Sequence, residues 1–315
     1  MNRDTTLDYL RGFAIMSIVI GHLYYFSGRA NGSIVWNICN TIQIPIFIYV
    51  SGFLAQYSIQ KYHFSVFIQT RFIRLIVPFV SFFIIWLIIK GISISNAILF
   101  FTDEFKQGFW FMIVLFELMV ILGINRIIER ITKINIFFLD VISLIIINIY
   151  HFFFSEHIIV NHFLSINLLW HYYPIFMIGV YSNKIPYLLN KRISFLYIIT
   201  YACAFYLMYA KNIHAMTALC NFSSLFFFVS FFNDSRHRIQ EAALVKTGIY
   251  SLQIYLLHIL FFGGLKNFIP IVDNRCIEAG LFIFLSITIC YLSICISYLL
   301  MKSKWIKLFL FGINQ

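Results

Sequence analysis

Stretches of about twenty apolar residues follow one another along nearly the whole chain, and a helix of that length spans the hydrocarbon core of a bilayer. Hydrophobic residues make up 61% and charged residues 11% of the 315 residues, whereas ordinary soluble domains are about 25% charged. The sequence therefore predicts an all-α fold, a polytopic bundle of transmembrane helices. The ten expected spans are 8–27, 34–59, 72–90, 108–125, 134–154, 164–182, 193–210, 214–232, 246–264 and 277–300.

The distribution of basic residues predicts the orientation of these spans. With a cytoplasmic N-terminus, 17 of the 23 lysines and arginines fall on cytoplasmic segments and 6 on outer ones. Cytoplasmic loops of membrane proteins are enriched in these residues. We therefore expect both termini in the cytoplasm. The sequence contains no low-complexity linker and no soluble segment, so we expect a single membrane domain over 1–315. The formal charge of +11 then reflects membrane topology and not a nucleic-acid partner. The six scattered cysteines include no CxxC pair, so we expect no metal site.

Arg11 and His22 are the most unusual residues of the first apolar stretch, because ionisable groups are costly inside a membrane. In a continuous helix His22 lies roughly 16 Å along the axis from Arg11. This spacing suits an arginine that anchors a phosphate at the cytoplasmic entrance and a histidine that acts as a base inside the bilayer. The alternative is a snorkelling arginine and a histidine that makes an ordinary interhelical hydrogen bond.

Glu117 and His258 are expected at a depth similar to that of His22. His258 follows Lys246 by twelve residues, or ~18 Å of straight helix, and Glu117 lies about nine residues from the outer end of its helix. Two histidines and a carboxylate in one layer would provide a general base and a group that orients it. The alternative for each is a lone interhelical hydrogen bond.

Arg71 and Arg74 are expected at the cytoplasmic start of the third helix, where their i, i+3 spacing places both on one face. Arginine forks suit phosphate oxygens, so these residues and Arg11 would hold a cytosolic ligand with several phosphates and a long arm, such as coenzyme A. The alternative is that they are ordinary positive-inside anchors.

Aromatic residues gather at the expected outer helix ends, where rings can stack on a sugar. The candidates for substrate binding are Trp110, Trp170 and His171, together with Tyr172 and Tyr173. Aromatic belts also occur at both interfaces of membrane proteins in general, which is the alternative explanation.

Four motifs in order resemble the acyltransferase-3 family of bacterial integral-membrane acyltransferases. They are LDYLRGFAIMSIVIGH at 7–22, IPIFIYVSGFLA at 44–55, RFIRLIVPF at 71–79 and GIYSLQIYLLH at 248–258. Weaker similarities are GFWFMIVLFE at 108–117 and YYPIFMIGVY at 172–181. Together they extend over nearly the whole chain.

This resemblance implies transfer of an acyl group, usually acetyl from acetyl-coenzyme A as co-substrate, to a hydroxyl of a cell-surface or lipid-linked carbohydrate. It implies that Arg11 and His22 are the essential pair and that Arg71 and Arg74 bind the donor. It also implies a multi-pass protein of the bacterial inner membrane with no permanently bound cofactor. The single Glu117 departs from the paired glutamates of some members.

Two other classes of function stay open from the residues alone. One is a secondary transporter of a glycan or small solute, with buried His and Glu as a proton relay. The absence of an internal sequence repeat argues against it. The other is a structural or assembly membrane protein, in which His22 would tolerate substitution.

Overall fold

A computed structural model describes residues 5–91, 98–154, 158–233, 243–265 and 274–313. All regular elements in these ranges are helices, so the all-α prediction is confirmed. The chain divides into two compact units. The first contains 1–50 and 182–299, and the second contains 51–181 and 300–315.

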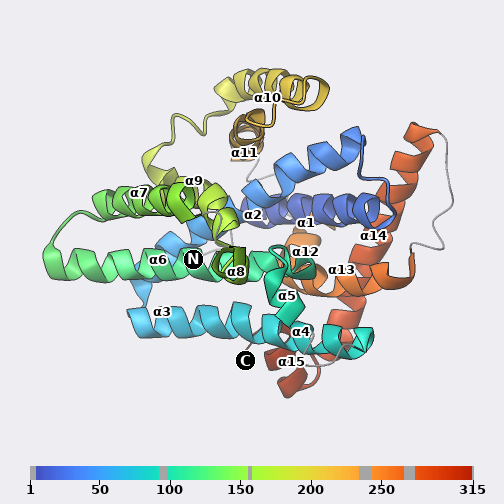
Figure 1. The fold of residues 1–315 in the computed structure, drawn as a ribbon, viewed down its shortest axis with the longest axis horizontal. Coiled ribbons are helices and arrows are strands. Elements are labelled where there is room, and N and C mark those ends of the chain that lie inside the picture. Colours follow the sequence, from blue (N-terminus) through green and yellow to red (C-terminus); the bar gives the residue numbers. More distant parts are fainter. Residues whose placement is uncertain (1–4, 92–97, 155–157, 234–242, 266–273, 314–315) are drawn as a thin grey trace. The chain divides into compact units, whose positions relative to one another are not determined.

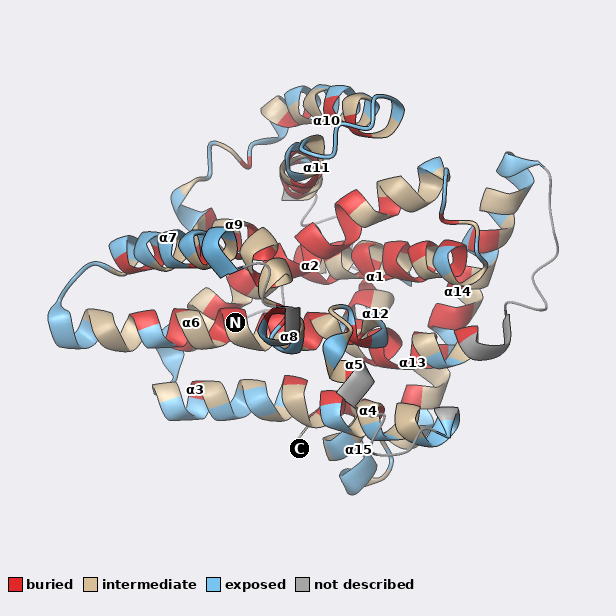
Figure 2. Cartoon of the chain, viewed as in Figure 1, coloured by how far each residue is buried: buried red, intermediate tan, exposed pale blue. Residues whose placement is uncertain are grey.

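The first unit is built around α1 (Thr5–Phe26), which lies beside α12 (Ala243–Ile249) and α13 (Ser251–Leu265) (Figure 1). Its other elements are the first part of α2 (Ile34–Lys61), η4 (Ser182–Lys184), η5 (Lys191–Ile193), α10 (Ser194–Ala210), α11 (Met216–Asn233) and α14 (Arg275–Leu300). α1 is buried along most of its length, and Figure 2 shows this as a largely red ribbon.

Two glycines allow α1 and α12 to touch through their backbones. A Cβ atom at Gly12 would lie 1.8 Å from the carbonyl oxygen of Leu244, and one at Gly248 would lie 1.7 Å from that of Asp8. Any side chain at either position would force the helices apart. Small residues permit such close helix crossings in membranes.

Polar contacts connect the remaining helices of the first unit. Arg29, after α1, forms an ion pair of 2.5 Å with Glu278 at the start of α14. The hydroxyl groups of Thr41 on α2 and Tyr201 on α10 are 2.9 Å apart. The hydroxyl of Ser224 on α11 donates to the carbonyl oxygen of Thr41.

The second unit contains the rest of α2 and a series of helices that follow it. These are α3 (Phe64–Arg71), the π-helical turn η1 (Phe72–Ile76), α4 (Val77–Lys90), α5 (Ile98–Thr102), η3 (Lys106–Gly108), α6 (Trp110–Thr132), α7 (Ile136–Phe154), α8 (Ile158–Phe163), α9 (Ile166–Tyr181) and α15 (Lys304–Phe311). α6, α7 and α9 pack on one another, and α15 packs on α4. The short helices α5, α8 and α15 were not expected from the sequence.

The third expected span was placed too late in the chain. The sequence predicts a helix over 72–90, but one apolar segment of 26 residues extends from Phe64 to Ile89. Arg71 therefore lies ~10 Å inside the segment and not at its start. The more polar first turns, which contain Ser65, Gln69 and Thr70, concealed the helix start from a reading based on hydropathy.

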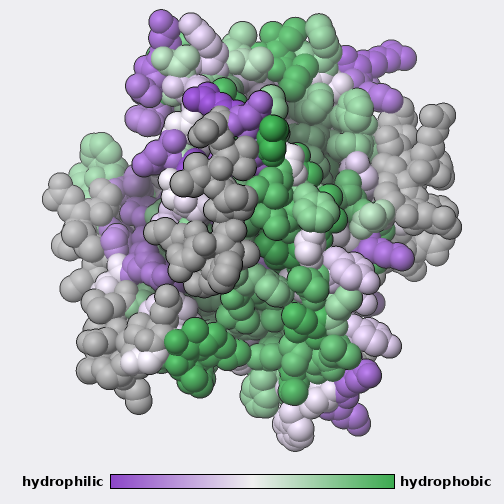
Figure 3. Space-filling view, turned by 90° about the vertical axis from the view of Figure 1, so that its right-hand side faces the viewer, coloured by the Kyte–Doolittle hydropathy of each residue, from purple (hydrophilic) through white to green (hydrophobic). Residues whose placement is uncertain are grey.

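Six helices in the described ranges are long and apolar enough to cross a membrane, or seven if α12 and α13 form one bent span. The predicted count of ten is therefore not confirmed. α1 contains Asp8, Arg11 and His22, which reduce its mean hydropathy, while α9 has only 16 residues. α11 is also a short apolar helix. Large hydrophobic side chains are nevertheless exposed on most helices, as expected of a surface that faces lipid. They form broad green areas on the face shown in Figure 3.

Candidate active site

His22 and His258 come together in the first unit. His22 Nδ1 lies 2.8 Å from His258 Nε2, and the two rings are nearly parallel, with an interplanar angle of 14°. The two residues are 236 positions apart in the sequence. The structure thus places two of the three residues predicted for catalysis in direct contact.

The hydrogen bonds around this pair define one arrangement of protons. His258 Nδ1 is 2.9 Å from the carbonyl oxygen of Ile254, which can only accept, so this nitrogen carries a hydrogen. In a neutral His258 ring, Nε2 is then an acceptor. His22 Nδ1 must therefore donate to it, which leaves the lone pair of a neutral His22 on Nε2. This tautomer is assigned from the hydrogen-bond chain.

Phenylalanine rings enclose the pair on one side. The edge-on ring of Phe262 has its centroid 6.2 Å from that of His22 and 5.6 Å from that of His258. Phe26 stacks on Phe262 and meets His22 edge-on. His258 is fully buried, whereas His22 is partly exposed. His22 is therefore the more accessible member of the pair.

The path of the chain to His258 differs from the prediction. The sequence suggests one straight helix over 246–264, but α12 and α13 meet at Tyr250 with a bend of 86°. The estimate of ~18 Å between Lys246 and His258 along a membrane-crossing axis is therefore wrong. The close α1–α12 crossing at Gly12 and Gly248 fixes the first arm of the bend, and the second arm contacts α1 again at His22.

Arg11 lies on the same continuous helix as His22, so the axial separation of roughly 16 Å applies. Its Nη1 is 3.6 Å from the Asp8 carboxylate, which is buried. The Arg11 side chain is 22% exposed, so its guanidinium can meet a ligand while Asp8 orients it.

Arg71 and Arg74 belong to the second unit and have different surroundings. Arg71 Nη2 donates to Ser58 Oγ on α2 at 2.6 Å, and the guanidinium lies over the ring of Phe67. Arg74 lies inside the π-helical turn and is exposed. The expected α-helical i, i+3 geometry is wrong here, because the wider turn begins directly after Arg71.

Glu117, the third predicted catalytic residue, lies on α6 in the second unit. Its Oε2 is buried and has no hydrogen-bond partner among the described residues. Lys106 exerts an electrostatic effect on this carboxyl group. Glu117 is thus a partly buried carboxyl group with a free acceptor atom.

Lys106 is a polar centre that the sequence analysis missed. It is completely buried, and its Nζ donates to the carbonyl oxygen of His162 at 2.5 Å and to Ser165 Oγ at 2.7 Å. Burial lowers the pKa of Lys106 to about 8, and the carboxylate of Glu117 opposes that shift. Lys106 and Gln107 both have left-handed backbone conformations, with φ of 44° and 53°. The hydrogen bonds of Lys106 thus connect the strained turn at Lys106 and Gln107 to the end of α8 and the residue before α9.

The aromatic residues predicted to bind substrate fall into two groups in the second unit. Trp110 stacks on Tyr172 at 5.6 Å, and His171 meets Tyr172 edge-on. Trp170 instead stacks on His151 at 4.1 Å and donates from Nε1 to Asn148 on α7. One face of Trp110 and one face of Trp170 are therefore occupied by protein rings.

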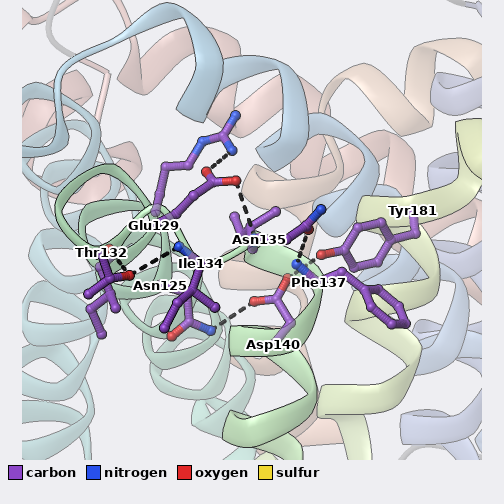
Figure 4. A network of polar contacts seen from close by, with 11 residues as sticks. Asn125, Glu129, Thr132, Ile134, Asn135, Phe137, Asp140 and Tyr181 are labelled. Atoms are coloured by element: carbon purple, nitrogen blue, oxygen red, sulfur yellow. Dashed lines mark hydrogen bonds and ion pairs between the residues drawn. The ribbon is translucent and has the colours of Figure 1, made fainter.

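A second polar network, also missed, joins α6, α7 and α9 (Figure 4). The buried Asp140 accepts hydrogen bonds from Asn125 Nδ2 at 2.8 Å and from the Tyr181 hydroxyl at 2.5 Å. Close by, Glu129 pairs with Arg126 and accepts from the backbone N–H of Ile136. The detectable signal was an isolated aspartate in the apolar stretch IFFLDVISLIII. Both carboxylate oxygens of Asp140 accept hydrogen bonds from side chains of the neighbouring helices. The network therefore connects α6, α7 and α9.

Comparison with protein families and with known proteins gives one match. The model of an acyltransferase domain, that of the acyltransferase-3 family, matches residues 4–302. No curated protein and no solved structure matches the chain. The match extends over nearly the whole sequence and includes every residue of the candidate site, and several apolar helices mark a multi-pass membrane protein. The chain belongs to the acyltransferase-3 family of membrane acyltransferases.

Proposed function

We propose that the protein transfers an acyl group, in particular acetyl, from acyl-coenzyme A to a hydroxyl of a cell-surface or lipid-linked carbohydrate. The observation that carries this proposal is the His22–His258 hydrogen bond of 2.8 Å, which leaves a basic nitrogen on the more accessible histidine. Family membership favours an acyltransferase over a transporter or a structural protein.

In this reaction His22 Nε2 takes the proton of the acceptor hydroxyl. The oxygen attacks the thioester carbonyl carbon, the carbon–sulfur bond breaks, and the coenzyme A thiolate leaves with the proton that His22 had taken. While His22 is protonated, its Nδ1–H continues to donate to His258 Nε2, so the positive charge has a hydrogen-bonded partner. A positioned base of this kind contributes ~10²–10⁴-fold to the rate. Transient acylation of His22 is the other route that the same nitrogen permits.

Arg11, Arg71 and Arg74 are the proposed ligands of the donor phosphates, and Asp8 and Ser58 orient the first two. Glu117 contributes an acceptor for a hydroxyl proton or a substrate hydrogen bond. Trp110, Trp170 and His171 are the proposed contacts of the acceptor sugar. The proposal includes ten spans with both termini in the cytoplasm of a bacterial inner membrane.

The direct test uses purified protein in detergent with acetyl-coenzyme A and an oligosaccharide acceptor. We expect release of the free thiol in equal amount to a new ester on the sugar, detected by mass spectrometry and removed by mild base. Hydrolysis of acetyl-coenzyme A without any modified sugar, or no thiol release with any acyl donor, would contradict the proposed reaction.

Topology is tested separately with reporter fusions. Fusions at Lys61, Arg130, Lys191 and Gln240 should read as cytoplasmic, and those at Asn31, His157 and Asp273 as external. A cytoplasmic signal at His157 would show that the spans are miscounted.

A further inference from the structure

The helix α15 rests on the segment that contains Arg74. α15 packs against α4, and its Phe311 is completely buried. The helix ends at Gly312, which has a left-handed conformation (φ 61°, ψ 29°) and donates its N–H to the carbonyl oxygen of Leu308. The C-terminal end of α15 thus lies against the π-helical turn Phe72–Ile76.

Pro78 limits the backbone hydrogen bonds that the carbonyl groups of that turn can accept. Pro78 has no N–H, so it cannot donate to the carbonyl oxygen of Arg74 in an α-helical pattern or to that of Ile73 in a π-helical one. Val77 N–H donates to Phe72. The ring of proline also crowds the carbonyl of the residue four positions earlier, which favours the wider turn.

Gly312 approaches the backbone of this turn directly. A Cβ atom at position 312 would lie 2.3 Å from the carbonyl oxygen of Ile73 and 2.5 Å from the Cα of Arg74. These are backbone atoms, so they cannot swing aside as a flexible side chain would. Only glycine fits, and its Cα–H group points at the Ile73 oxygen in the manner of a weak hydrogen bond.

We propose that α15 and Gly312 are a positioning element of the donor site, which holds the π-helical turn so that Arg74 is presented to the phosphates of coenzyme A. This inference rests on the proposed role of Arg74 in donor binding. π-helical turns inside α-helices are frequent at functional sites, and here a distant segment of the chain supports one.

The test compares substitutions at two glycines with nearly identical backbones. Gly91 ends α4 with φ 60° and ψ 29°, but a Cβ there would meet nothing within 4 Å. Gly91→Ala therefore introduces the left-handed strain alone, whereas Gly312→Ala adds the collision with Ile73 and Arg74. Gly312→Asn keeps the collision and reduces the strain, because asparagine tolerates this conformation.

We expect Gly312→Ala and Gly312→Asn to raise the donor KM roughly ten-fold, since small displacements of binding groups carry large penalties. Their kcat and acceptor KM should stay close to wild type. Gly91→Ala should leave all three constants unchanged. If neither variant at 312 folds, Phe311→Leu provides a milder loosening of the same contact, with a smaller rise in donor KM.

Two results would overturn the inference in different ways. Equal donor KM values for the Gly312 and Gly91 variants, in a wild-type enzyme that transfers acetyl, would show that α15 does not position the donor site. A wild-type protein that transfers no acyl group would remove the proposed function itself.

Discussion

Substitution of Gly248 by alanine tests the dependence of the histidine pair on the α1–α12 crossing. The new Cβ would lie 1.7 Å from the carbonyl oxygen of Asp8. A carbon–oxygen contact needs about 3.3 Å, so the two backbones must separate by roughly 1.6 Å. If the bend at Tyr250 transmits this shift, the His22–His258 distance grows from 2.8 Å to about 4.4 Å, beyond a hydrogen bond.

We expect kcat to fall about 10²-fold in Gly248→Ala, because misplacement of a catalytic group by 1 Å carries that penalty. Overpacking should also reduce the free energy of unfolding by ~1–3 kcal/mol. Gly280→Ala is the matched control in the same unit, since a Cβ there meets nothing within 4 Å. The assay is acetyl transfer in detergent, with thermal unfolding measured in parallel. A Gly248→Ala enzyme with wild-type kcat would refute the reasoning.

Three further perturbations have defined outcomes. Lys106→Met should lower the melting temperature, because the His162 carbonyl and Ser165 hydroxyl lose their buried donor, at ~1–3 kcal/mol for each group left unsatisfied. The folded-state pKa of about 8 lies below the ordinary 10.5, so the unfolded chain binds more protons between these values. The stability of wild type relative to Lys106→Met should therefore rise from pH 8 to pH 10, and a fall would contradict this. Tyr181→Phe removes a hydrogen bond to Asp140 and should reduce the free energy of unfolding by ~1.5–3 kcal/mol, measured by thermal unfolding with kcat unchanged. The double variant Arg71→Lys with Arg74→Lys should raise the donor KM roughly ten-fold, because lysine lacks the planar guanidinium group that binds phosphate oxygens in pairs. An unchanged donor KM would show that both arginines only anchor the helix at the membrane surface.

Hydropathy predicted most of the helix positions, because burial in a bilayer requires long apolar segments whatever their tertiary contacts. The expected spans 34–59, 193–210 and 277–300 differ from α2, α10 and α14 by only a few residues at their ends. Hydropathy did not predict local breaks within helices. The bend at Tyr250 has no hydropathy signature, and α15, an amphipathic helix of 8 residues, is too short to be found as a membrane span.

The candidate site was predictable in part. Isolated ionisable residues in apolar stretches singled out His22, His258 and Glu117, but the contact between the two histidines depends on tertiary packing. His258 reaches His22 because two glycines, at positions 12 and 248, allow a backbone crossing on the other side of the bend. Lys106 lies in the polar turn TDEFKQG, where a lysine is expected at the surface, so nothing in the sequence marked it as buried.

The most direct measurement of the central claim is acetyl transfer by variants of the histidine pair. His22→Ala should lose ~10²–10⁴-fold in kcat with normal membrane insertion. His258→Gln, which can still accept from His22 Nδ1, should keep more activity than His258→Ala. His214→Ala, at an exposed histidine, serves as the control and should match wild type. Near-normal transfer by His22→Ala, or equal activity of the two His258 variants, would contradict a base oriented by its histidine partner.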